Sequence, residues 1–166
     1  MTGVSERHFG VALNVISALR AHLRGTTCKT FAIDIKLHID VLGSYFYPDA
    51  FVTCSLQNGQ DPLVKREPSL VVAVLSPSTA AHDRGDKFQA YRTLPSLRDY
   101  LLIDPDPRRC GLHRLGDDGL WVLHPSEPGV SVTLKSVDLE LSADVLWDEV
   151  PLPVAIASGS AQPGTP

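Results

Sequence analysis

The first hydrophobic pattern along the chain has the period of a helix. Ser5 stands where an N-cap residue would begin such a helix, and Gly25 follows its last apolar position. Between them, apolar residues recur every three or four positions at Phe9, Ala12, Ile16, Leu19 and Leu23. This spacing puts the apolar side chains on one face, so it predicts an amphipathic helix that packs against the rest of the protein.

The next patterns are typical of strands. From Phe31 to Ile39, apolar and polar residues alternate strictly, which predicts one half-buried strand with a polar face. That face carries Asp34 and Lys36, either as a solvated surface or as a polar floor beneath a site. A short apolar run from Phe51 to Ser55 predicts a second strand.

Residues 68–77, PSLVVAVLSP, contain a continuous apolar run bounded by prolines. Such a run predicts a central strand that is covered on both faces. Because side chains alternate across a strand, two faces are expected, one with Val71, Ala73 and Leu75 and the other with Leu70, Val72 and Val74.

The remaining elements complete an α/β pattern. Tyr100–Ile103 reads as another buried strand, and strands at 111–115 and 120–123 flank a turn at 116–119. Residues 130–134 and 137–141 are predicted edge strands. The pattern fits one domain over residues 5–150, and the polar segment 151–166 is predicted to be a disordered tail.

Two short segments carry candidate chemistry. Asp49 lies in a Tyr-Pro-Asp sequence at the entry to a strand, where Pro-Asp is also ordinary turn chemistry. Asp83, Lys87 and Tyr91 are four residues apart and therefore share one side of a helix. That stripe is either the rim of an active site or an exposed Asp-Lys pair beside a tyrosine that packs on the sheet.

Four segments follow one another along the chain: FYPDAFVTC at 46–54, PSLVVAVLSPST at 68–79, DRGDKFQAY at 83–91 and DYLLIDP at 99–105. In this order they resemble the restriction-endonuclease family often called the Uma family, a branch of the PD-(D/E)XK nuclease superfamily. The resemblance implies a restriction-endonuclease-like core, with a central mixed β-sheet flanked by helices. It also implies a metal-dependent DNA endonuclease, and it includes the Asp-Lys-Tyr stripe.

The resemblance assigns roles to individual residues. Asp49 would be one carboxylate ligand of Mg²⁺ or Mn²⁺, a hard cation that activates water and neutralises developing charge. Lys87 would act on the attacking water, because the usual lysine position two residues after the second acid holds Leu75. Asp83 and Tyr91 would form the site rim.

The family's central strand reads Glu-Val-Leu-Ser-Pro-Ser-Thr, and this chain has Ala73 in place of the glutamate. With fewer oxygen ligands, we expect the metal to bind weakly if at all and hydrolysis to fall steeply. Glu67 would lie about 20 Å away along the strand, whereas Asp83 and Asp86 are near enough to lean in. Two further hypotheses are an inactive relative that binds nucleic acid or protein, and a structural or dimerising domain.

Composition restricts these hypotheses. The net charge of −4 and the pI near 5.8 are unlike a broad DNA-binding face. Local cations remain as possible phosphate contacts, with a solvated helix face as the alternative: Arg84, Lys87, Arg92 and Arg98. The three cysteines have no metal-site spacing, and neither zinc nor a disulfide is predicted.

Location and partners follow from smaller signals. No apolar run is long enough to span a bilayer and no signal-peptide core is present, so we expect a cytoplasmic protein without membrane contact. The family usually has a strand or two before the helix that begins here near His8. A missing segment would expose an edge and favour a homodimer. His8 matches a family histidine, although a surface histidine is the simpler interpretation.

Overall fold

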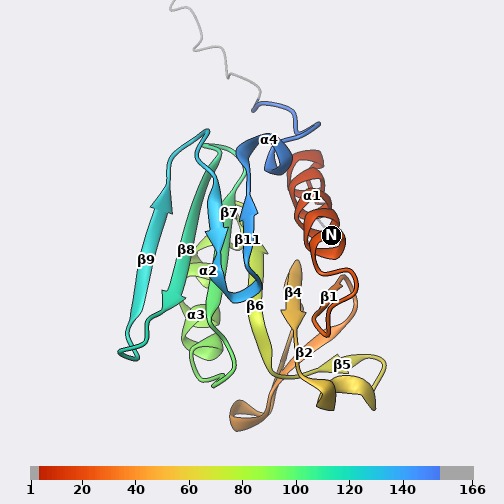
Figure 1. The fold of residues 1–166 in the computed structure, drawn as a ribbon. Helices are drawn as coiled ribbons and strands as arrows, with labels where there is room; N and C mark the ends of the chain where they lie inside the picture. Colours follow the sequence, from red (N-terminus) through yellow and green to blue (C-terminus); the bar gives the residue numbers. More distant parts are fainter. Residues whose placement is uncertain (1–3, 154–166) are drawn as a thin grey trace, which may run out of the picture.

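A six-stranded mixed sheet forms the centre of the computed structural model, which describes residues 4–153 except the side chains of residues 58 and 59. Figure 1 shows this sheet between two layers of other elements. Its strands, in spatial order, are β1 (Lys29–Ala32), β4 (Ala50–Thr53), β6 (Pro68–Val74), β7 (Asp99–Asp104), β8 (Arg109–Leu115) and β9 (Trp121–Ser126). Only β6 and β7 run parallel, and the other neighbouring pairs in this sheet are antiparallel. This arrangement confirms the predicted α/β fold with a central mixed sheet.

One face of the sheet is covered by the long helix α1 (Glu6–His22) and by elements from the end of the described chain. These elements are β10 (Val132–Leu134), the 3₁₀ turn η3 (Lys135–Val137), β11 (Leu139–Leu141) and α4 (Ala143–Leu146). β10 and β11 pair with each other in a separate two-stranded sheet, so the prediction that they are edge strands of the main sheet was wrong.

The opposite face carries two short helices, α2 (Ala80–Arg84) and α3 (Asp86–Tyr91), and a small three-stranded sheet. Its strands are β2 (Lys36–Ile39), β3 (Ser44–Phe46) and β5 (Val64–Lys65), with the 3₁₀ turns η1 (Asp40–Leu42) and η2 (Leu56–Gly59) nearby in sequence. The sequence predicted one helix through Asp83 and Lys87, but the structure interrupts it at Gly85, which ends α2 and precedes α3.

The central strand β6 divides two hydrophobic clusters, as its alternation predicted. Leu70, Val72 and Val74 pack with α1 on one side, and Val71 and Ala73 pack with α3 and the small sheet on the other. Burial on both faces explains why the strand has no polar alternation of its own.

Helix α1 confirms part of its predicted pattern. The hydroxyl of Ser5 accepts a hydrogen bond from the His8 backbone N–H, so Ser5 caps the helix as expected. The buried stripe, however, is centred on Val11, and Phe9 is 61% exposed. At about 100° per residue, Phe9 lies roughly 160° around the helix from Val11, beyond the part that the sheet covers.

The predicted strand from Phe31 to Ile39 is two strands in two different sheets. The chain turns at Ile33, which has φ of 60° and is 78% exposed, and the Ile35 N–H donates to the Ala32 carbonyl across the turn. A β-branched residue is an unusual choice for this backbone region. Strict alternation therefore continued through a turn that no glycine or proline marked.

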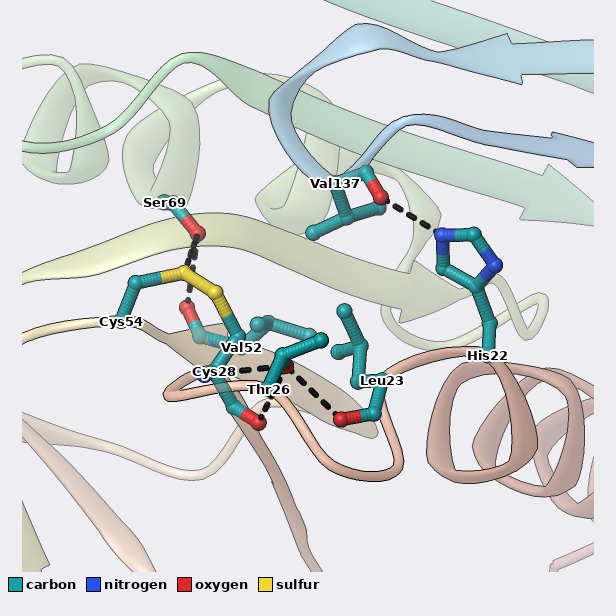
Figure 2. The surroundings of a disulfide bond; sticks show 8 residues. All are labelled: His22, Leu23, Thr26, Cys28, Val52, Cys54, Ser69 and Val137. Atoms are coloured by element: carbon teal, nitrogen blue, oxygen red, sulfur yellow. Dashed lines mark hydrogen bonds between the residues drawn. A yellow bond between two sulfur atoms is a disulfide. The ribbon is translucent and has the colours of Figure 1, made fainter.

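A disulfide joins Cys28 and Cys54, contrary to the prediction that no disulfide forms. Figure 2 shows the bond beside Ser69 of β6. The two cysteines flank the pair Lys29 and Thr53, which are opposite each other in the β1–β4 ladder. Strand register, which cysteine spacing does not encode, brings them together, and the free thiol of Cys110 is buried elsewhere.

We predict that reduction of this disulfide destabilises the protein. The bond closes a loop with a sequence separation of 26 residues, and the loss of its constraint on the unfolded chain corresponds to about 3–4 kcal/mol. Dithiothreitol should therefore lower the midpoint of thermal unfolding by about 10 °C. The Cys28→Ser/Cys54→Ser variant should start low and not respond to the reductant, while Cys110→Ala should respond as the parent does. Three reactive thiols in the unreduced, denatured parent would contradict the assignment.

Candidate active site

A cleft of about 630 Å³ opens beside the end of β6, between the start of α1 and helices α2 and α3. Its polar lining comes from segments that are far apart in sequence. The polar residues are Ser5, Arg7, His8, Tyr47, Asp49, Ser76, Ser78, Thr79, Asp83, Lys87 and Asp106. Of the predicted site residues, the cleft therefore brings together Asp49, Asp83 and Lys87.

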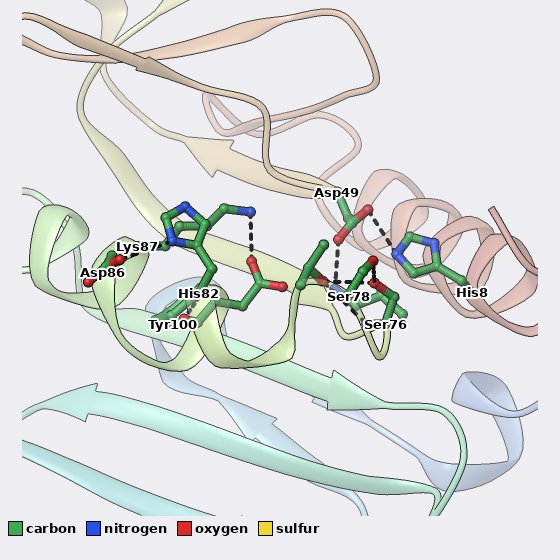
Figure 3. A network of polar contacts seen from close by, with 11 residues as sticks. His8, Asp49, Ser76, Ser78, His82, Asp86, Lys87 and Tyr100 are labelled. Carbon is green, nitrogen blue, oxygen red and sulfur yellow. Dashed lines mark hydrogen bonds and ion pairs between the residues drawn. The ribbon is translucent and has the colours of Figure 1, made fainter. Parts of the chain in front are cut away.

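Asp49 is held by contacts to both of its carboxylate oxygens. Its Oδ2 accepts a hydrogen bond of 2.7 Å from the Val74 backbone N–H, and its Oδ1 lies 3.5 Å from His8 Nε2. Figure 3 shows His8 and Asp49 facing each other across the end of the cleft. Burial raises the pKa of Asp49 above its usual value, an effect that the Val74 hydrogen bond and His8 oppose and that Asp83 reinforces. The cleft therefore holds a carboxyl group that ionises at a cost.

The register of β4 and β6 implies that position 73 faces Asp49. In the antiparallel ladder of β4 and β6, Ala50 pairs with Val72 and Phe51 with Val71. Continuing this register by one residue places Asp49 opposite Ala73, and opposed residues on one face have Cβ atoms about 4.5–5.5 Å apart. A glutamate at position 73 would therefore carry its carboxyl group close to that of Asp49.

Asp83 and Lys87 form a second charged group in the cleft. The Lys87 ammonium lies 2.6 Å from Asp83 Oδ1, and the side chain of Asp83 is 3% exposed while that of Lys87 is 24% exposed. The Tyr100 hydroxyl donates to the Asp83 backbone carbonyl at 2.8 Å, which fixes α2 on the sheet. This geometry contradicts the interpretation of an exposed surface pair, because the carboxylate is buried.

Tyr91 lies beneath these charges. Its side chain is buried, and its ring contacts those of Phe46 and Tyr100. Burial, with smaller contributions from Asp83 and Asp49, raises the pKa of its phenol. Tyr91 therefore remains protonated and supports the site from the core side.

The predicted phosphate contacts lie elsewhere. Arg84 pairs with Asp104 at 3.4 Å, and Arg92 lies 5.3 Å from the centre of the Phe88 ring. Neither arginine lines the cleft.

The two other acidic residues considered as substitute ligands also lie away from the cleft. Glu67 accepts a hydrogen bond from the Ser55 hydroxyl on another part of the surface. Asp86 is exposed and interacts with His82.

Sequence reasoning missed the roles of two side chains of this site, His8 and Arg7. His8 was interpreted as a surface histidine, but its side chain is only 16% exposed and faces Asp49, so that interpretation was wrong. Arg7 lines the cleft and contacts Asp106 at 2.7 Å. Ser5 caps α1 and so fixes where the helix starts. The one sequence signal for His8 was its match to a histidine near the helix start in the resembled family.

The carboxylates of the cleft do not amount to a complete metal site. Among residues 4–153, no group of three or more His, Cys, Asp or Glu side chains is placed to share a metal ion. Asp49 already accepts from Val74, Asp83 is paired with Lys87, and Ala73 offers no oxygen. A hard divalent cation prefers six or more oxygen ligands, so this donor set falls short.

The fold and cleft define a nuclease-like α/β domain. The chain belongs to the Uma2 family, described as "Putative restriction endonuclease", whose model matches residues 1–146. This match confirms the resemblance seen in the sequence.

Individual proteins agree with this placement. The chain is 35% identical to protein slr1290 of Synechocystis sp. over 147 residues, which are 89% of this chain and 77% of the relative. It is 34% identical to sll1609 of the same organism over 125 residues, 74% of this chain and 71% of the relative. A solved structure from Anabaena variabilis, described as "a putative nuclease belonging to DUF820", shares the fold with a TM-score of 0.72 and 16% identity. The match covers 87% of this chain and 82% of that one.

We predict that Lys87 stabilises the fold through Asp83. Because Lys87→Ala leaves a buried carboxylate without its partner, the free energy of unfolding should fall by about 3 kcal/mol. Urea unfolding followed by the fluorescence of Trp121 and Trp147 measures this loss. The uncharged pair Asp83→Asn/Lys87→Met should recover most of it. A single variant within about 0.5 kcal/mol of the parent would show that Asp83 does not depend on Lys87.

We predict that Asp49→Asn stabilises the protein at neutral pH. Burial raises the pKa of Asp49 in the folded protein. The protonated Asp49 side chain therefore contributes favourably to the free energy of unfolding, and this contribution is lost as the pH rises through the raised pKa. Asparagine retains an oxygen for the Val74 N–H and never ionises. The thermal midpoints of parent and variant should coincide at about pH 3, below the pKa of an unfolded-state aspartate, and separate in favour of the variant at about pH 8. A variant that is less stable at the higher pH would mean that ionised Asp49 is stabilising.

Proposed function

We propose that this chain carries the site of a metal-dependent DNA endonuclease in which one acidic ligand is missing, so that phosphodiester hydrolysis is weak or absent. The main support is the strand register, which, continued by one residue beyond the Ala50–Val72 pair, brings Ala73 opposite Asp49, and Asp49 lines the cleft together with Lys87. In this proposal Mg²⁺ or Mn²⁺ binds weakly, because one carboxylate fewer faces it.

The residues that remain have separable tasks. Asp49 presents a carboxylate whose orientation is fixed by the Val74 N–H. Lys87 places an ammonium group at the cleft, where it neutralises the charge of a bound phosphate group. Asp83 holds that ammonium in position through their 2.6 Å contact.

The proposed partner is DNA that approaches the cleft rather than a broad surface. A net charge of −4 opposes binding over the whole molecule. Two positively charged side chains nevertheless line the cleft, where Arg7 lies 2.7 Å from Asp106 and Lys87 lies 2.6 Å from Asp83. Each of these side chains has further N–H donors beyond its carboxylate contact, and with them it can contact one phosphate-bearing strand at this place.

A second candidate function is a binding module without catalysis. Ala73 itself favours it, because this side chain is only 5% exposed and packs in a hydrophobic cluster with Tyr91 and Tyr100. In that role the cleft would retain its ligand but would not cleave it.

Restoration of the glutamate tests the first proposal. We predict that Ala73→Glu gives cleavage of plasmid and single-stranded DNA with Mg²⁺ or Mn²⁺, because it places a second carboxylate beside Asp49. Ala73→Gln is the matched control, since it introduces nearly the same shape into the core without the charge. Gel assays measure the cleaved fraction, and the midpoint of unfolding shows whether each variant is folded.

Two further variants define the outcome. Adding Asp49→Asn to Ala73→Glu should abolish the cleavage, and adding Lys87→Ala should reduce it by about 100-fold or more. A folded Ala73→Glu variant that cleaves no DNA would overturn the endonuclease proposal and favour the binding module. Equal cleavage by the Glu and Gln variants would show that position 73 is not a ligand position.

A further inference from the structure

Two exposed tyrosines, Tyr45 and Tyr47, precede Asp49 in the sequence. Tyr45 on β3 is 53% exposed, and Tyr47, two residues later, is 56% exposed and lines the cleft. Pro48 keeps the preceding residue in an extended conformation, so Tyr47 continues the direction of β3. Alternate residues of an extended segment point to the same side. Tyr45, Tyr47 and Asp49 therefore follow one another at alternate positions, and the last two share the cleft.

The Tyr45 ring stacks on the ring of His38. The ring centre of His38 lies 4.4 Å from that of Tyr45 in a stacked arrangement, and His38 Nδ1 lies 2.6 Å from Asp40. Phe46, the residue between the two tyrosines, packs into the core against Tyr91. Tyr45 therefore lies on a strand that the core holds in place, and its side chain is nevertheless 53% exposed.

A positively charged side chain lies beside the Tyr45 ring. Lys36 Nζ lies 5.7 Å from the centre of the Tyr45 ring. The carboxylate of Asp40, on the same side of the small sheet, is paired with Arg66 at 3.0 Å, and this pairing lowers the pKa of Asp40. An aromatic surface with a cation next to it is the combination that binds single-stranded nucleic acid, because every base has a flat face and every linkage a phosphate.

We propose that Tyr45 and Tyr47 form a stacking platform for the bases of single-stranded DNA whose backbone enters the cleft at Asp49 and Lys87. Lys36 contacts a phosphate beside Tyr45. The proposal rests on the function proposed above and specifies the form of its substrate. Duplex DNA keeps its bases stacked on one another, so the platform selects unpaired strands or strand ends.

The test is the affinity of the full chain for a fluorescein-labelled oligothymidylate of about twelve nucleotides, measured by anisotropy at low salt. We expect Tyr45→Ala and Tyr47→Ala each to weaken binding by on the order of ten-fold, whereas Tyr45→Phe and Tyr47→Phe, which retain the rings, bind as the parent does. Phe9→Ala is the matched control, because it removes an equally exposed ring that does not line the cleft. Lys36→Ala should weaken binding and reduce the salt dependence.

The same titrations with a duplex of equal length complete the design. The alanine variants should leave any duplex affinity unchanged. Equal losses for single strand and duplex, equal losses for the Ala and Phe variants, or no binding of the single strand by the parent would each overturn the platform.

The binding result is independent of the cleavage result. Weaker binding by the alanine variants, with no cleavage by Ala73→Glu, would support the platform and reject only the endonuclease proposal. Cleavage by Ala73→Glu that the tyrosine variants do not affect, together with unchanged binding, would reject only the platform.

Discussion

The antiparallel pairing of β4 with β6 is the constraint on which the candidate site depends. It sets Asp49 immediately before β4, where the register continued by one residue faces Ala73 of β6, and it brings the Val74 N–H within 2.7 Å of the Asp49 carboxylate. A shift of one residue in this register would reverse the faces of β6 and separate the two positions. Such a shift would also exchange the side chains that β6 contributes to the two clusters, Leu70, Val72 and Val74 on one face and Val71 and Ala73 on the other.

Burial of the charged residues in the cleft costs electrostatic free energy. Asp49 and Asp83 are carboxylates in a partly dry space, and burial raises the pKa of Asp49. Asp83 is tolerated because Lys87 lies 2.6 Å away and because Tyr91 and Tyr100 anchor its helices to the sheet. Groups arranged at such a cost are typical of functional sites, although structural ion pairs also occur. The alanine at position 73 adds neither a further negative charge to this group nor a side-chain oxygen.

The sequence predicted the parts of the structure that local patterns encode. The faces of β6, the Ser5 cap and the β8–β9 hairpin follow from alternation, capping chemistry and turn residues, and the structure contains all of them. The resemblance identified the family, which the comparison confirms. The predicted tail from residue 154 onward lies outside the part of the chain that the structure describes. Among residues 4–153, no helix is long and apolar enough to cross a membrane.

What the sequence did not predict depends on tertiary position. The turn at Ile33 interrupts an unbroken alternation, and no local signal marks it. Cys28 and Cys54 meet because of strand register, and His8 faces Asp49 because of where α1 crosses the sheet. The roles of Arg84 and Arg92 were inferred from their place in the motif, but their side chains are directed to Asp104 and Phe88. The resemblance pointed to Asp49, Asp83 and Lys87 of the cleft but not to Arg7.

We infer that position 73 is the missing ligand position beside Asp49. The decisive experiment is calorimetric titration of Mn²⁺ into the parent, Ala73→Glu and Ala73→Gln proteins, without DNA. We expect an affinity gain on the order of ten-fold or more for the glutamate variant alone, and loss of that gain when Asp49→Asn is added. Equal Mn²⁺ affinities for the glutamate and glutamine variants, or a gain that persists without the Asp49 carboxylate, would contradict it.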